Sequence, residues 1–184
     1  MNSLKGQLLV ATPHLMDPNF VHTVLLMIEH TDEGAAGLVL NRPSGRTIAE
    51  IAGSVFDEDL GWDKAIHLGG PVPGPVLVLH QVEELADSEV MPGLFSTVDS
   101  DKLLEILRRE PEPSLVLANY AGWGAGQLER EIEEDAWRTR SASFEHIFWT
   151  GQDDLWDVLN RAIGHATLAE MLHLDKLPSD PSLN

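Results

Sequence analysis

A glycine-rich segment between a hydrophobic run and a helix-like pattern holds the clearest candidate binding chemistry in the sequence. It reads NYAGWGAGQ over residues 119–127, and its candidate ligand-binding residues are Asn119, Gly122, Trp123, Gly124, Gly126 and Gln127. Unpaired backbone amides at the start of a helix attract anions, and the helix dipole adds partial positive charge there. The spacing G-x-G-x-G, with no Lys-Ser/Thr after it, excludes a Walker loop and a dinucleotide-binding fingerprint. The segment fits either a small-anion site or close packing of Trp123 and the helix against the strand.

Two polar pairs at the ends of predicted strands complete the candidate ligand-binding set. Asn41-Arg42 follows one strand, and the Arg42 guanidinium could hold a phosphate or carboxylate through two parallel hydrogen bonds. It could equally pair with one of the thirty acidic residues of the chain. Glu29-His30 ends another strand, where the two side chains form either an acid–base pair or hydrogen bonds that close the following turn.

Patterns for metal-dependent or nucleophilic catalysis are missing from the sequence. The eight histidines show neither H-x-x-x-H nor H-E-x-x-H spacing, and there is no cysteine. Glu131, Glu134 and Asp135 resemble half of a carboxylate metal site, but they lack an E-x-x-H partner and are predicted to face solvent. No G-x-S-x-G motif surrounds a serine. The sequence therefore predicts no catalytic residue, no metal ligand and no cofactor.

Short apolar runs separated by Gly, Pro and Asp predict the strands that must position these residues. The runs cover residues 7–11, 23–29, 36–41, 66–68, 75–80, 92–98, 114–120, 137–141 and 144–150. Several are continuous rather than alternating, which indicates strands covered on both faces, whereas 92–98 is edge-like. Capping residues predict helices that begin after Thr47, after Asp99, after the glycine-rich segment, after Asp153 or Asp154, and after Thr167.

The order of these elements indicates the fold class. Strands come in pairs before helices, so regular βαβ alternation is not followed. A chain of 184 residues without a linker or a repeat fits one compact domain. We predict a single α+β (irregular α/β) domain over residues 1–176, with a substantially antiparallel sheet and short helices, followed by a flexible tail over residues 177–184.

Charge and hydropathy limit the partners of the protein. Thirty acidic residues against twelve Lys and Arg give a net charge of -18, which opposes binding to nucleic-acid phosphates. No apolar run approaches the roughly 18 residues that a membrane-spanning helix needs. The N-terminal apolar stretch is too short for a secretory signal. We expect a cytoplasmic protein that binds neither membranes nor, directly, nucleic acid.

Five motifs taken together resemble the YqgE/AlgH family of bacterial proteins. They are P-x-L-x-D-P-x-F at 13–20, E-H at 29–30, G-x-x-x-N-R-P at 37–43, G-G-P at 69–71 and G-W-x-x-G-Q-L-E at 122–129. The resemblance runs from about Leu8 to beyond Ile163. It implies a compact domain built on a mixed, barrel-like sheet in a bacterial cytoplasmic protein. It supplies no reaction, although some members of the family are labelled as transcriptional regulators.

Three functions follow from the sequence, in descending order of preference. The first is a non-catalytic regulatory or interaction module that binds a small anionic ligand or a protein. The second is an enzyme that acts on a phosphorylated or carboxylated metabolite, with a site among Glu29, His30, Asn41, Arg42 and residues 119–127. The third is a transcriptional regulator that acts indirectly or through nucleic acid, which the charge and the lack of a basic helix-turn-helix disfavour. The sequence leaves the oligomeric state open.

Overall fold

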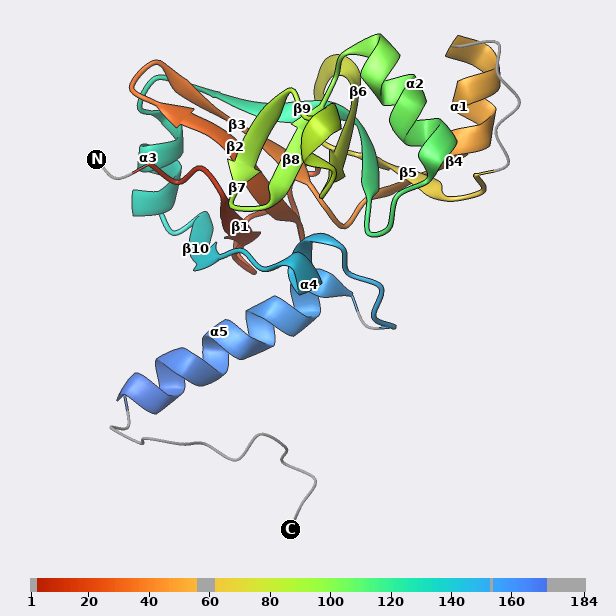
Figure 1. Cartoon of the computed structure of the whole chain (residues 1–184). Coiled ribbons are helices and arrows are strands. Elements are labelled where there is room, and N and C mark those ends of the chain that lie inside the picture. Colours follow the sequence, from red (N-terminus) through yellow and green to blue (C-terminus); the bar gives the residue numbers. More distant parts are fainter. Residues whose placement is uncertain (1–2, 56–61, 153, 172–184) are drawn as a thin grey trace.

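The computed structural model describes residues 3–55, 62–152 and 154–171 (Figure 1). The predicted C-terminal tail, residues 177–184, lies outside these ranges. The strands are β1 (Gln7–Ala11), β2 (Val24–Thr31), β3 (Gly34–Val39), β4 (Pro43–Thr47), β5 (Ala65–Leu68), β6 (Val72–His80), β7 (Ser88–Met91), β8 (Leu94–Thr97), β9 (Leu115–Gly124) and β10 (Trp137–Ser141). The helices are α1 (Ile48–Val55), α2 (Ser100–Arg109), α3 (Gln127–Glu133), α4 (Phe144–Ile147) and α5 (Leu155–Met171), with a 3-10 turn η1 (Glu83–Leu85).

In the described part of the chain the strands form one sheet in the order β10-β1-β2-β3-β9-β6-β8-β7. Strand β5 adds a parallel pairing to β9, and β4 pairs antiparallel with β5. The sheet curls until β7 approaches β2, which gives a half-barrel. The prediction of a mixed, largely antiparallel, barrel-like sheet with short helices is therefore confirmed. The edge-like prediction for 92–98 is wrong, because β8 lies between β6 and β7.

The central strands β6 and β9 are buried on both faces. Leu77, Leu79 and Leu117 pack into a large apolar cluster with the side chains of β1 and β2. Val78 and Val116, one residue away on the opposite face, pack into a second cluster under α2. Successive strand residues point to opposite faces, so a continuous apolar run fills both clusters at once. This arrangement explains why PVLVLH and SLVLANY contain no polar alternation.

Two predicted helix starts have the expected capping hydrogen bonds. At α1, Oγ1 of Thr47 accepts from the Glu50 amide at 3.3 Å, and Oε2 of Glu50 accepts from the Thr47 amide at 3.1 Å. At α2, the Asp99 side chain accepts from the amides of Asp101 and Lys102. Both caps satisfy backbone donors that the first helical turn leaves unpaired.

Two sequence predictions near the C-terminus are wrong. Residues 144–150 do not form a strand, because the Ser143 side chain caps α4 by accepting from the His146 amide at 3.3 Å. A separate helix does not begin at Thr167; α5 runs through it, and the Thr167 hydroxyl donates to the Ile163 carbonyl at 3.0 Å. The first residues of α5 pack on the body, and the rest of the helix projects away from it (Figure 1).

A histidine at the end of β6 is buried without a charge partner in hydrogen-bonding contact. The side chain of His80 is fully buried; its Nε2 donates to Oγ1 of Thr97 at 2.8 Å, and its Nδ1 accepts from the Val82 amide at 3.1 Å. The Thr97 hydroxyl in turn donates to the Leu85 carbonyl at 2.6 Å. Burial lowers the pKa of His80 below 6.5, although Asp87 and Glu84 oppose this shift. The imidazole is therefore neutral in the folded protein near neutral pH.

The folded protein should lose stability as the pH falls below about 6.5, because the unfolded chain then binds a proton that folded His80 binds less readily. We expect the free energy of unfolding to decrease more between pH 7 and pH 5 in the wild type than in His80→Gln. Urea unfolding at several pH values measures this, with the exposed His14→Gln as the matched control. Equal pH dependence in wild type and His80→Gln would contradict the assignment.

Candidate functional site

Glu29 and His30 do not act as a pair, because neighbouring strand residues point to opposite faces. Glu29 is exposed, whereas the His30 side chain is 5% exposed. Nε2 of His30 donates to Glu129 at 2.8 Å, and Nδ1 accepts from the Leu4 amide at 3.0 Å. The pKa of Glu129 lies below its usual value because its own backbone amide and His30 donate to it. His30 thus ties β2 to α3 and to the N-terminal segment.

Asn41 is occupied by contacts within the fold. Its Oδ1 accepts from the Val24 amide at 3.0 Å, and its Nδ2 donates to the His22 carbonyl at 2.9 Å. A longer contact of 3.5 Å joins Nδ2 to Oδ1 of Asp154, just before α5. The side chain fastens the end of β3 to the start of β2.

Arg42 donates to backbone carbonyls and pairs with no carboxylate in the described part of the chain. One terminal nitrogen donates to the Asn19 carbonyl at 2.6 Å, and the other reaches the carbonyls of Pro18 at 3.3 Å and Val21 at 3.2 Å. The loop before β2 has no regular secondary structure of its own, so these carbonyls need external donors. The planar fork of arginine therefore supports this loop.

The glycine-rich segment is a strand for most of its length, so the prediction that a turn leads from strand to helix over residues 121–126 is wrong. Strand β9 continues to Gly124, with Gly122 opposite Ala36 and Gly124 opposite Gly34. The Gly124 amide donates to Oε1 of Gln127 at 3.1 Å. The turn shrinks to Ala125 and Gly126, and Gly126 has a φ of 67°. Pairing along β3 occupies the backbone that was expected to face an anion.

Asn119 also has a role within the sheet. Its φ of 67° places it in the left-handed region inside β9. Its Oδ1 accepts from the Gly74 amide at 3.3 Å, where the β6–β9 register shifts between Val72 and Val76. Asparagine tolerates this backbone conformation better than most residues. The side chain therefore stabilises an irregular stretch of the ladder.

The carboxylate of Glu131, predicted to face solvent, instead accepts three hydrogen bonds from side chains. Oε2 accepts from the indole nitrogens of Trp123 at 2.9 Å and Trp137 at 2.8 Å, and Oε1 accepts from Nε2 of Gln127 at 2.9 Å. The two indole rings meet edge to face, with centroids 6.1 Å apart. The sequence analysis did not predict this cluster. A signal for it was present, because one tryptophan lies eight residues before Glu131 and another lies six residues after it.

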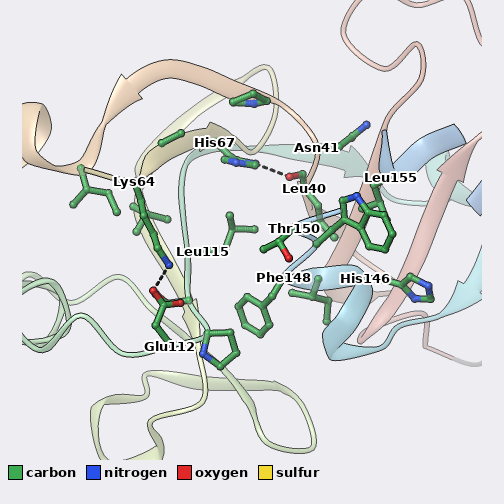
Figure 2. A pocket seen from close by; sticks show the side chains of 18 of the residues that line it. Leu40, Asn41, Lys64, His67, Glu112, Leu115, His146, Phe148, Thr150 and Leu155 are labelled. Atoms are coloured by element: carbon green, nitrogen blue, oxygen red, sulfur yellow. Dashed lines mark hydrogen bonds and ion pairs between the residues drawn. The ribbon is translucent and has the colours of Figure 1, made fainter. Parts of the chain in front are cut away.

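One cavity lies away from most of the predicted site residues. It has a volume of about 380 Å³ and is lined by β5, the start of β9, residues 146–150 and residues 154–155 (Figure 2). Asn41 alone among the ten candidate ligand-binding residues lines it, so the structure does not bring the ten together. Figure 2 places His67 on one side, Phe148 on the other and Thr150 between them. The volume lies in the range of small-molecule sites.

Apolar residues form most of the cavity wall, and a minority of the lining residues is polar or charged. Nδ1 of His67 donates to the Leu40 carbonyl at 2.5 Å, and burial lowers the His67 pKa, so the ring is neutral near neutral pH. Oγ of Ser114 is buried and has no hydrogen-bond partner in the described ranges. Lys64 and Glu112 form an ion pair at the opposite end of the cavity from His146 (Figure 2). Sequence reasoning missed this site, since its residues come from four separate segments.

A metal-binding cluster and a membrane-spanning helix are both absent from the residues that the structure describes. No group of three His, Cys, Asp or Glu side chains there could hold a metal ion. No helix among them is long and apolar enough to cross a membrane.

Replacing Glu131 should destabilise the protein, because Glu131→Ala leaves two indole N–H donors without their acceptor. We expect the free energy of unfolding to fall by about 1–3 kcal/mol. The exposed Glu133→Ala, in the same helix, should change it by less than about 0.5 kcal/mol. Urea unfolding monitored by tryptophan fluorescence measures both. Equal effects of the two variants would show that the carboxylate does not organise the tryptophans.

Replacing Arg42 should loosen the loop before β2. We expect Arg42→Ala to lower the free energy of unfolding by about 1–2 kcal/mol and to speed exchange of the Phe20 and Val21 amides. Arg46→Ala is the matched control, because its ion pair with Glu50 is exposed. Hydrogen exchange followed by NMR gives the readout. Unchanged exchange in Arg42→Ala, together with lost binding of inorganic phosphate, would instead indicate a ligand-binding arginine.

Comparisons with known proteins agree with the fold and extend over almost the whole chain. Residues 8–167 match the model of a family described as AlgH-like. A UPF0301 protein of Chlorobaculum tepidum is 40% identical over 186 residues, covering 97% of this chain and 95% of that protein. A UPF0301 protein of Myxococcus xanthus is 39% identical over 172 residues, covering 89% and 93%.

Two solved structures are also similar. The solution structure of the AlgH protein of Pseudomonas aeruginosa superposes with a TM-score of 0.73 at 34% identity, covering 97% of each chain. The crystal structure of protein DIP2367 of Corynebacterium diphtheriae gives a TM-score of 0.70 at 25% identity, covering 88% of this chain and 87% of that one. The family resemblance seen in the motifs is thereby confirmed: this chain belongs to the AlgH-like, or UPF0301, family.

Proposed function

We propose that this protein is a non-catalytic regulatory module that binds a small molecule in the cavity and, through it, controls an interaction with a protein partner. The observation that carries this proposal is the cavity itself, with its volume of about 380 Å³ and walls that are mostly apolar but include several polar side chains. Small-molecule sites in proteins have this composition.

The position of the cavity supports a regulatory role. One wall belongs to the sheet, through His67 and Leu115, and another belongs to the segment that ends in Leu155, the first residue of α5. A ligand that contacts both walls would therefore bias the position of α5. Since α5 projects from the body, a change in its position is available to a partner (Figure 1). This couples ligand binding to an interaction without a chemical step.

The other functions expected from the sequence receive less support. The side chains of His30, Asn41 and Arg42, which would form part of an enzyme site, are used in hydrogen bonds within the fold. The net charge of -18 continues to disfavour direct binding of nucleic acid. A regulator that acts through a protein partner remains consistent with both facts.

A fragment library screened by thermal shift and by NMR chemical-shift perturbation tests the proposal. We expect compounds that raise the melting temperature and shift the amide signals of His67, Leu115 and Leu155, because a ligand that binds only the folded protein stabilises it. Thr150→Trp should abolish these effects by filling the cavity. Met16→Trp introduces the same indole side chain at an exposed position outside the cavity and should leave them unchanged.

Two results would contradict the proposal. One is a library in which no compound perturbs the cavity signals. The other is binding that survives in Thr150→Trp, since the ligand would then occupy a different site.

A further inference from the structure

The hydrogen-bonding state of His67 limits what the cavity can accept. Its Nδ1 carries the proton, because it donates to the Leu40 carbonyl at 2.5 Å. Nε2 therefore presents a lone pair, and it has no partner among the described residues. In a neutral imidazole one nitrogen donates and the other accepts. The cavity wall thus contains an acceptor that only a ligand or water can satisfy.

The charged groups around the cavity disfavour an anionic ligand. The positive charge of Lys64 is paired with Glu112, and Asp154 adds a further carboxylate to the lining. The protein as a whole carries a net charge of -18. An anion would lose its hydration and find no unpaired cation on these walls, which makes its transfer unfavourable.

A cation inside the cavity is also disfavoured. Glu112 is paired with Lys64, and Asp154, whose Oδ1 accepts from the Trp156 amide at 2.8 Å, is exposed, so a cation paired with Asp154 would remain in water. A buried cation needs a carboxylate that is free to pair with it. A neutral molecule avoids both penalties.

The apolar part of the lining indicates the shape of the ligand. Phe148, Trp149, Pro113 and Leu115 offer flat or branched apolar surfaces. The volume of about 380 Å³ equals about a dozen water molecules at ~30 Å³ each, which suits a molecule of one or two rings. Rings pack on aromatic side chains through offset or edge contacts.

We infer that the cavity binds a neutral, mostly apolar ring compound whose O–H or N–H group donates a hydrogen bond to Nε2 of His67. This inference rests on the proposed ligand-binding function and deepens it by assigning the chemistry of the ligand. The sequence predicted a small anionic ligand, whereas the cavity favours a neutral one because Lys64 is already paired with Glu112.

The test is an NMR titration of the isotope-labelled protein at neutral pH with phenol, toluene and benzoate. These probes share a ring and differ in donor and charge. We expect phenol to bind about three- to tenfold more tightly than toluene, the ratio that one net hydrogen bond gives, and benzoate to bind most weakly. Equal affinity for phenol and toluene, or tighter binding of benzoate, would overturn the inference.

Two variants and one direct measurement assign the acceptor. His67→Phe keeps a ring of similar size and should remove the preference for phenol over toluene, whereas Ser114→Ala should retain it. Because His67→Phe also loses the bond to Leu40, the imidazole nitrogen signal of wild-type His67 provides an independent readout. It should shift on addition of phenol and not of toluene. A preference that survives in His67→Phe, or a nitrogen signal that phenol leaves unmoved, contradicts the assignment.

The outcomes separate this inference from the function on which it rests. If the fragment library yields no cavity ligand at all, the proposed function fails. If cavity ligands are found but they are anions, or bind His67→Phe as tightly as wild type, only the inference about ligand chemistry fails.

Discussion

The close approach of backbones around β9 is the constraint on which the rest of the fold depends. This strand pairs with β3, β5 and β6, and both of its faces are covered by apolar clusters. A side chain at Gly34 would place its Cβ 2.5 Å from the Trp123 carbonyl oxygen, and one at Gly69 would place it 2.5 Å from the Asn119 carbonyl oxygen. Only glycine permits these approaches, so the G-G-P motif at 69–71 has a backbone explanation.

The polar residues of the motifs secure the parts that surround this strand. His30 joins β2 to α3 through Glu129, and Arg42 holds the loop before β2. Each of these two contacts links segments that are distant in sequence or lack regular structure. Outside the motifs, Glu131 accepts hydrogen bonds from two indole rings. Their hydrogen bonds are used within the fold, which leaves ligand chemistry to a different region of the molecule.

Sequence reasoning recovered what local patterns determine. The continuous apolar runs gave the two-sided burial of β6 and β9, and the Thr47 and Asp99 caps placed the starts of α1 and α2. The sequence-based predictions failed where the interacting groups are distant in sequence. Pairing with β3 extends β9 through its glycines, and Arg42 donates its hydrogen bonds to backbone carbonyls. Ser143 capped a helix where an apolar run suggested a strand. The cavity could not be predicted from the sequence, because residues from several distant segments, including β5 and β9, line it.

Residues that build the fold are thus separate from the cavity that we propose as the ligand-binding site. The most direct measurement of this separation is the set of intermolecular nuclear Overhauser effects between bound phenol and the protein. The account predicts contacts from the ring protons to the side chains of Phe148, Leu115 and Leu155. Contacts instead to Trp123, Gln127 and the loop held by Arg42 would place the binding site at the sequence motifs and contradict it.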